Sequence, residues 1–235
     1  MKRAPFQDGE LEIRQIFEAE DFGARSLRSL KTRNVPLARS WLQSRSAETR
    51  IAVSKRAPRT LNTGRLCGHA VTENDLSYVL AIDSDWEIQK TLFGTLSTPD
   101  ESKQRLARWL QMWAEHGFGF WIFSDAANNA VGHGGLFPSR HNSEWIELGY
   151  VLKPAHWKLG YATEIAIASC RVGFEKLGVD RIVAVAKADN RGSRRVMEKC
   201  GFSFEREFVY AERWPSVLYK LDRNRWLRSH ASPKR

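Results

Sequence analysis

The clearest periodic pattern of apolar and polar positions lies in residues 97–117. The apolar stripe of this segment consists of Leu106, Trp109, Leu110 and Trp113, and a spacing of three to four residues is typical of one helical face. Thr98 suits the N-cap, Pro99 the first helical position and Glu101 the third residue of a capping box. Gly117 is a typical C-terminal stop. The pattern predicts a helix that starts and ends within this segment.

Shorter apolar runs separated by turn residues predict strands. In chain order these runs are 118–125, 130–137, 146–152, 181–188, 202–211 and 216–223. Further helical patterns cover 76–82, 162–178 and 190–201. Residues 126–129 suit a hairpin loop between the first two strands. Helices that alternate with strands predict an α/β (α+β) domain with a mixed sheet.

The ends of the chain differ from its middle. Residues 24–60 are rich in Arg, Ser and Thr and show little sustained periodicity, although 11–22 could form a short helix. We therefore predict a basic, poorly ordered N-terminal extension over 1–60. A single domain is expected over 61–223, followed by a basic C-terminal tail over 224–235.

The net charge of +10 is concentrated in these ends. Residues 1–60 contain 13 Lys and Arg against 7 Asp and Glu, and residues 222–235 contain 5 against 1. Residues 61–221 contain 19 of each sign and are neutral. A basic domain surface that recognises nucleic acid is therefore not expected, beyond weak contact of RNA with the basic ends.

Several protein classes are not indicated by the sequence. No run of 18 or more apolar residues is present, and the N-terminal MKRAPFQDGE lacks the apolar stretch of a secretory signal. These features favour a cytoplasmic protein without a membrane partner. Cys67, Cys170 and Cys200 are odd in number and scattered. They fit neither a disulfide framework nor a metal site, so we expect no metal and reduced thiols.

The segment HWKLGYATEI, residues 156–165, is a candidate anion site. It follows the strand predicted over 146–152 and begins the next helix, whose N-terminus would present unpaired N–H groups. Gly160 and Ala162 would allow a phosphate to approach the backbone closely, and Lys158 would add a positive charge. The alternative is that Gly160 is only a turn residue. Neither GxGxxG nor a P-loop signature is present.

Two longer stretches carry a family resemblance. IELGYVLKPAHWKLGYATE and RIVAVAKADNRGSRRVMEKCGFSFERE resemble the GNAT superfamily of acyl-CoA N-acyltransferases. The nearest branch acetylates protein N-termini, including those of ribosomal proteins, and also includes small-amine acetyltransferases. The resemblance covers about residues 63–223. It implies a mixed central sheet of about seven strands flanked by helices, with acetyl-CoA as cosubstrate in a cleft where two parallel strands part.

The resemblance also implies a set of cofactor-binding residues. Backbone amides around the pyrophosphate would come from Lys158, Leu159, Gly160, Tyr161, Ala162 and Thr163. Main-chain groups of Val151 and Leu152 would contact the pantetheine arm, and Asn190 and Ser193 would bind this arm or the nucleotide end. Two alternatives remain open. Asn190 could only cap the following helix, and Ser193 could be a solvated helix residue.

For catalysis, direct acyl transfer to an amine in a ternary complex requires a base, a polarised carbonyl and a protonated leaving group. Glu147 is the candidate base, because strand alternation places it on the same face as Gly149 and similar enzymes use a Glu near this position. It could instead be a paired surface carboxylate. Glu144 and His133 are the reserve candidates. A backbone N–H of 151–152 would polarise the carbonyl.

The proton donor for the thiolate is not evident from the sequence. Many GNAT enzymes have a Tyr seven residues after the Asn, where this chain has Met197. Ser193 or Tyr161 could substitute, or the thiolate could leave unassisted. The alternative function is therefore a non-catalytic acyl-CoA-binding protein, or a basic RNA- or ribosome-associated module on the same fold.

The acceptor is expected to be a primary amine, either of a protein N-terminus or of a small molecule, and the protein a monomer or homodimer. A small amine such as a polyamine would require a closed acidic pocket. Asp83, Asp85 and Glu87 could contribute to one, although a solvated loop explains these residues equally well.

Overall fold

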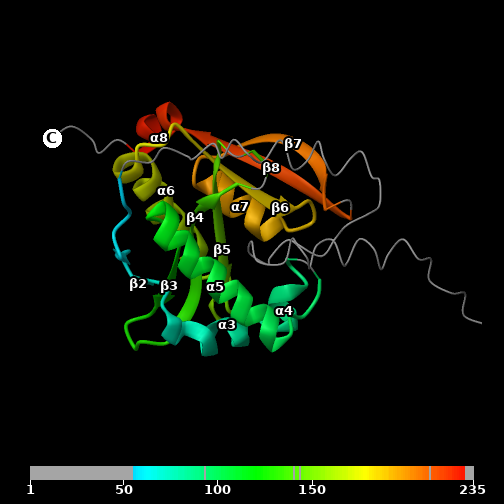
Figure 1. The fold of residues 1–235 in the computed structure, drawn as a ribbon. Coiled ribbons are helices and arrows are strands. Elements are labelled where there is room, and N and C mark those ends of the chain that lie inside the picture. Colours follow the sequence, from blue (N-terminus) through cyan, green and yellow to red (C-terminus); the bar gives the residue numbers. More distant parts are fainter. Residues whose placement is uncertain (1–54, 93, 140, 143, 212, 231–235) are drawn as a thin grey trace, which may run out of the picture. The chain divides into compact units, whose positions relative to one another are not determined.

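A mixed sheet of eight strands forms the centre of the described part of the chain (Figure 1). The computed structural model describes residues 55–230 except 93, 140, 143 and 212. The strands are β1 (Thr60–Asn62), β2 (Cys67–Ala70), β3 (Phe120–Ser124), β4 (Ala130–Pro138), β5 (Ile146–Leu152), β6 (Arg181–Lys187), β7 (Ser203–Tyr210) and β8 (Trp214–Asp222). Their order in the sheet is β1-β2-β3-β4-β5-β6-β8-β7. This is the predicted mixed sheet, with one strand more than expected.

The junction of β5 and β6 is the one parallel pairing in this sheet. Only two residue pairs join the strands, Ile146 with Ile182 and Glu147 with Val183. Beyond them β5 continues to pair with β4, and β6 continues to pair with β8. The two strands therefore part toward their carboxyl ends, which is where open α/β sheets bind ligands.

Helices cover both faces of the sheet. They are α3 (Leu76–Asp83), α4 (Trp86–Gln89), α5 (Pro99–His116), α6 (Tyr161–Arg171), which continues as a π-helical segment over Val172–Leu177, α7 (Arg191–Lys199) and α8 (Arg223–His230). Short 3-10 turns cover Glu73–Asp75 and Pro154–His156. On one face, Trp109 of α5 lies 4.6 Å from the ring of His133 in β4. On the other face, a Cβ added to the neighbouring Gly134 would meet Ile165 of α6.

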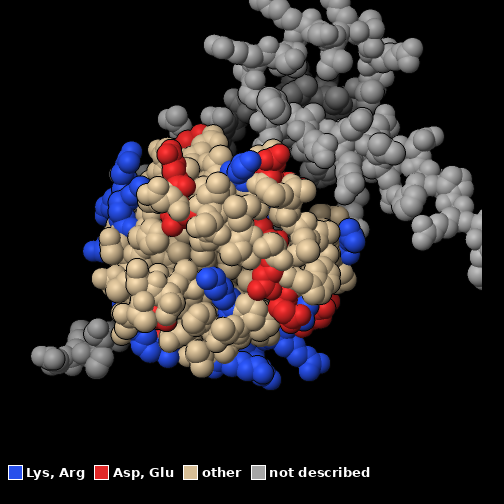
Figure 2. All heavy atoms as spheres, turned by 90° about the horizontal axis from the view of Figure 1, so that it is seen from below, with Lys and Arg blue, Asp and Glu red and all other residues tan. Residues whose placement is uncertain are grey.

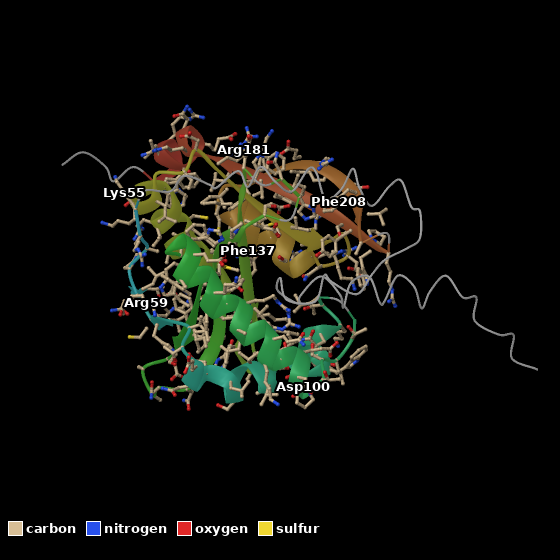
Figure 3. All side chains as sticks on the ribbon, in the orientation of Figure 1. Lys55, Arg59, Asp100, Phe137, Arg181 and Phe208 are labelled. Atoms are coloured by element: carbon tan, nitrogen blue, oxygen red, sulfur yellow. The ribbon has the colours of Figure 1, made fainter. Side chains whose placement is uncertain are left out.

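The start and end of α5 follow from local signals. The Thr98 side chain accepts a hydrogen bond from the Glu101 N–H, and the Glu101 carboxylate accepts one from the Thr98 N–H, which confirms the capping box. Asp100, labelled in Figure 3, lies in the same first turn, where its negative charge interacts favourably with the positive end of the helix dipole. Gly117 ends the helix with a φ of 73°, a left-handed conformation suited to glycine.

The domain extends beyond both predicted boundaries. On the N-terminal side, Ala57 is buried and donates its N–H to the Gly117 carbonyl, so the folded domain begins before residue 61. On the C-terminal side, the first part of the predicted tail forms α8, because Trp226 is buried against Phe174. Residues 1–54 and 231–235, including the helix predicted over 11–22, lie outside the described residues.

The described domain carries charges of both signs. On the face shown in Figure 2, acidic and basic side chains both occur, so this face is not a surface of one sign. This agrees with the equal numbers of acidic and basic residues over 61–221. None of the helices in the described residues combines the length and apolar character needed to cross a bilayer.

Candidate active site

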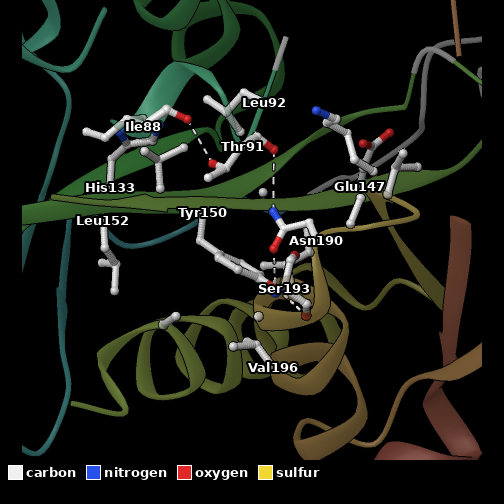
Figure 4. A pocket seen from close by; sticks show the side chains of 18 of the residues that line it. Ile88, Thr91, Leu92, His133, Glu147, Tyr150, Leu152, Asn190, Ser193 and Val196 are labelled. Carbon is white, nitrogen blue, oxygen red and sulfur yellow. Dashed lines mark hydrogen bonds between the residues drawn. The ribbon is translucent and has the colours of Figure 1, made fainter. Parts of the chain in front are cut away.

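A cavity of about 1020 Å³ lies where β5 and β6 part (Figure 4). Nine of the residues predicted to form the site line it, namely Glu147, Val151, Leu152, Lys158, Gly160, Ala162, Thr163, Asn190 and Ser193. They come from β5, the loop before α6, the first turn of α6 and the start of α7. The tertiary structure thus brings together residues from three separate segments of the chain.

The loop that precedes α6 has the features of an anion site. Gly160 is the N-cap with a φ of 85°, and Lys158 also has a positive φ, 63°. No side chain caps this helix end, so its first N–H groups remain for a ligand. A side chain at Gly160 would be strained, and its Cβ would lie 3.4 Å from Nη2 of Arg65. The backbone conformation at this position therefore favours glycine, which fits both a phosphate-binding turn and the simple turn residue of the alternative interpretation.

Leu159 and Tyr161, predicted with the loop, do not line the cavity. The Leu159 side chain is exposed, and its carbonyl accepts a hydrogen bond from Nη2 of Arg65. The Tyr161 ring lies under the Arg65 guanidinium, 4.4 Å from its carbon to the ring centroid. Any role of these two residues at the cleft would therefore be through the backbone alone. Arg65 itself was not identified from the sequence, because its contacts are about 95 residues away along the chain.

Glu164, in the first turn of α6, anchors Arg65. Its carboxylate accepts hydrogen bonds from the Arg65 N–H and Nε and from the Thr63 hydroxyl. Partial burial opposes ionisation, but the hydrogen bonds from Thr63 and Arg65 outweigh it and lower the pKa of Glu164. The negative charge of Glu164, close to the candidate anion site, is thus balanced by the guanidinium of Arg65.

At the open end of β5, Val151 and Leu152 line the cavity as expected. The Leu152 carbonyl accepts a hydrogen bond from the Trp157 indole at 2.8 Å and so already has a partner. Val151 lies opposite His133 in the β4–β5 register. Paired residues of neighbouring antiparallel strands point to the same face, so both side chains face α3 and α5.

At the start of α7, Asn190 has the role that the alternative interpretation assigned to it. Its Oδ1 accepts the Ser193 N–H at 3.0 Å and caps the helix, while its Nδ2 donates to the Thr91 carbonyl. Figure 4 shows both Asn190 and Ser193 at the cleft. Both residues line the cavity, so capping and ligand contact are compatible for Asn190. Met197, one turn after Ser193, is buried.

Tyr150 is a site residue that the sequence analysis missed. Its hydroxyl lies 2.9 Å from the Ser193 Oγ and also donates to the Ser193 carbonyl at 3.1 Å. Burial raises the pKa of Tyr150, so the hydroxyl stays protonated. The signal was present in the run ELGY, because alternation places Tyr150 on the face opposite Glu147, toward α6 and α7. What was not visible was the partner on α7.

Glu147 lies on the α3 and α5 side of the sheet, opposite Phe137 in register. Its Oε2 accepts a hydrogen bond from the Ser139 hydroxyl at 2.9 Å, and the side chain lines the cavity. Glu144, the first reserve candidate, precedes β5, is exposed and does not line the cavity. The structure therefore places Glu147, and not Glu144, at the cleft.

His133, the second reserve candidate, is a buried neutral histidine. Its Nδ1 lies 2.9 Å from the Tyr78 hydroxyl, and the rings of Trp109 and Phe120 pack against it. Burial, assisted by the charge of Arg105, lowers the pKa of His133 to about 3. A histidine with this pKa is a weak proton acceptor, which argues against a role as the base.

A family model described as an acetyltransferase (GNAT) domain matches residues 65–203. The chain is 30% identical over 190 residues to the FsC-acetyl coenzyme A-N(2)-transacetylase of Aspergillus fumigatus, with 74% of this chain and 80% of that protein covered. It is 28% identical over 163 residues to YoaA, an uncharacterized N-acetyltransferase of Bacillus subtilis, with 66% and 90% covered.

Solved structures share the fold. A GNAT-family acetyltransferase from Bacillus anthracis has a TM-score of 0.61 at 23% identity and covers 70% of this chain and 99% of its own. Spermidine N-acetyltransferase from Vibrio cholerae, in complex with CoA and spermine, has a TM-score of 0.59 at 17% identity. The match covers 69% of this chain and 98% of that protein. A putative ribosomal-protein-serine acetyltransferase from Vibrio cholerae has a TM-score of 0.57 at 18% identity. The match covers 71% of this chain and 99% of that protein. At these identities the likeness concerns the fold.

Proposed function

Because the chain belongs to the GNAT acetyltransferase family, we propose that its cleft binds acetyl-CoA and that Glu147 assists direct transfer of the acetyl group to a primary amine. The amine would be carried by a small molecule or by a protein N-terminus. The observation that carries this proposal is the parting of β5 from β6 beside the uncapped N-terminus of α6. The gap between β5 and β6 offers space for the extended pantetheine arm, and the N-terminus of α6 offers a site for the phosphates.

The pyrophosphate fits the loop before α6. The free N–H groups of the first turn and the positive end of the helix dipole favour an anion there. Lys158, Gly160, Ala162 and Thr163 all line the cavity at this point. Gly160 and Ala162 leave the backbone accessible, and Lys158 adds a positive charge.

The pantetheine arm fits the edge of β5. Its pairing with β6 ends at Glu147, and the described residues supply no other strand on that side, although β5 remains paired with β4 on the other. A strand edge with free backbone groups can bind an extended ligand that carries amides, much as it would bind another strand. Asn190 and Ser193 would contact the ligand from the start of α7.

Acetyl-CoA supplies a thioester, and transfer forms an N–C bond and breaks the C–S bond. One proton must leave the amine, and one must reach the CoA sulfur. Glu147 would accept the first, directly or through water, and Ser139 would orient its carboxylate. Ser193 would donate the second, with the Tyr150 hydroxyl as its hydrogen-bond partner, because Met197 has no proton to donate. Water at the open cleft would return a proton to Ser193 and take one from Glu147.

Isothermal titration with acetyl-CoA tests the binding step. Gly160→Glu places bulk and negative charge at the proposed pyrophosphate site, so we expect the micromolar binding of the wild type to be lost. Gly178→Glu is the matched control, since Gly178 also has a positive φ, 76°, and has open space around its Cβ position. Equal binding by both variants, or no binding by the wild type, would contradict the proposed site.

The buried Met197 favours a second candidate function, in which the cleft binds an acyl-CoA without turnover. Acetyl-CoA binding together with no acetylation of any amine in a broad panel would support it. Release of CoA in the presence of an amine would support the enzyme instead.

A further inference from the structure

The part of the cleft on the α3 and α5 side of the sheet has mainly apolar walls. We call it the acceptor half, because Glu147 faces it from β5. Its walls are formed by Ile88, Leu92, Trp109, Met112, Phe120 and Phe137. Figure 4 shows Ile88 and Leu92 on the opposite side of the strands from Ser193 and Val196. These walls would favour an apolar body over a charged one.

Among the described residues, the acceptor half contains one carboxylate besides Glu147, that of Asp83. Its charge is already balanced by Arg105. Asp83 is buried at 2% exposure. It accepts the Ser102 hydroxyl at 2.7 Å and forms an ion pair of 2.9 Å with Nε of Arg105. A buried carboxylate with these partners holds α3 to α5 and has little capacity left for a substrate cation.

The other two acidic residues considered for an acidic pocket are also engaged. Asp85 caps α4 by accepting the Ile88 N–H, and Glu87 forms an ion pair with Lys90. Neither lines the cavity. The acidic pocket that a polyamine would require is therefore not assembled in the described residues.

The two arginines of the acceptor half are engaged as well. Arg105 is paired with Asp83, and Arg108 also has an interaction partner, so neither is taken as an unopposed positive charge. His133, between Trp109 and Phe120, is neutral and offers a hydrogen bond without a countercharge. Within the part of the chain that the structure describes, Glu147 is the carboxylate positioned to meet the reacting amine itself.

We propose that the acceptor is a monoamine carried on an aromatic or aliphatic body, and not a polyamine. This inference rests on the proposed function, because it assumes that the amine reacts beside Glu147. The apolar walls would bury the body, and Asp83, already bound to Ser102 and Arg105, would offer little to an ammonium group further along the substrate.

Binding of bisubstrate conjugates tests this inference without requiring turnover. Each conjugate joins the CoA sulfur through an acetyl linker to one amine, either 2-phenylethylamine, spermidine or a short peptide with Phe at its N-terminus. Affinities are measured by titration calorimetry and compared with that of CoA. We expect the phenylethylamine conjugate to bind about tenfold or more tightly than CoA, since it buries a phenyl group, and the spermidine conjugate to show no such gain.

The outcomes separate the two levels of the proposal. Failure of CoA itself to bind would contradict the proposed function. If CoA binds, a spermidine conjugate that equals or exceeds the phenylethylamine conjugate would overturn the inference, as would no gain for either. A gain for the Phe peptide as large as for phenylethylamine would support the inference and indicate a protein N-terminus as the source of the amine.

A pair of wall variants gives a second test. Leu92→Glu adds a carboxylate to the acceptor half, and Leu92→Gln adds a polar group of similar size without charge. If the missing carboxylate decides the preference, only Leu92→Glu should improve spermidine conjugate binding, by about tenfold. Equal effects of the two variants would count against the proposed role of charge.

Discussion

Arg65 and Glu164, 99 residues apart in the chain, form a salt bridge beside the loop that precedes α6. The distance from Nη2 to Oε2 is 2.8 Å, and the same guanidinium holds the Leu159 carbonyl. The pair joins the segment between β1 and β2 to the turn that contains Gly160. It therefore offers a way to hold the proposed pyrophosphate loop in its binding conformation before the ligand arrives.

Arg65→Gln should weaken acetyl-CoA binding with little effect on kcat. Without the guanidinium the loop must be ordered on binding, which costs about 1 kcal/mol and raises Kd and KM for acetyl-CoA about threefold to tenfold. Titration calorimetry and steady-state kinetics measure both. Arg59→Gln removes the same charge from an exposed site on Trp113 and should leave both constants unchanged. Equal Kd values for Arg65→Gln and wild type would show that the salt bridge does not organise the loop.

Glu147→Gln should lower kcat/KM for the amine about 10²- to 10⁴-fold, the usual contribution of a general base. The amide can still accept the hydrogen bond from Ser139 but cannot take a proton at neutral pH. Acetyl-CoA binding should be unaffected. Glu144→Gln is the control, because this exposed residue does not line the cavity. A similar loss in both variants would argue that neither carboxylate is the base.

Tyr150→Phe and Ser193→Ala should each lower kcat, and their effects should not add. The two hydroxyls are 2.9 Å apart and would deliver one proton between them, so removal of either interrupts the same pathway. A double-mutant cycle on kcat, with acetyl-CoA Kd measured in parallel, distinguishes this from loss of binding. Fully additive losses would indicate that the two hydroxyls act independently.

His133 should make the domain less stable as the pH falls. The folded-state pKa is about 3, below the ordinary value of 6.5, so the unfolded chain binds the proton first. Stability is therefore lost as the pH falls below about 6.5, by about 2 kcal/mol between pH 7 and pH 5 for this one group. Gln does not titrate, so His133→Gln should lose about 2 kcal/mol less of its free energy of unfolding between pH 7 and pH 5 than the wild type. Urea unfolding at the two pH values measures this difference. An unchanged loss would mean that His133 is not the responsible group.

Much of the fold could be predicted because its signals are local. The helix α5 begins with a Thr98–Glu101 capping box and ends at Gly117, and both signals lie within a few residues of the helix end that they define. The six predicted strands and the turn at Gly160 likewise follow from alternation and from backbone requirements within short segments. The short strand β1 and the helix α8 were missed, since each depends on distant partners. For α8 the decisive contact is that of Trp226 with Phe174, which composition alone could not reveal.

For the site, the sequence alone determined the family resemblance and predicted the loop proposed to bind the cofactor and Glu147 as the candidate base, because these are carried by contiguous motifs. Only the tertiary structure decided which polar groups remain for a substrate. Arg65 pairs with Glu164, Tyr150 with Ser193, and Asp83 with Arg105, over separations of 99, 43 and 22 residues. Whether a polar side chain already has such a partner depends on distances in space, and the linear order of residues does not contain these distances.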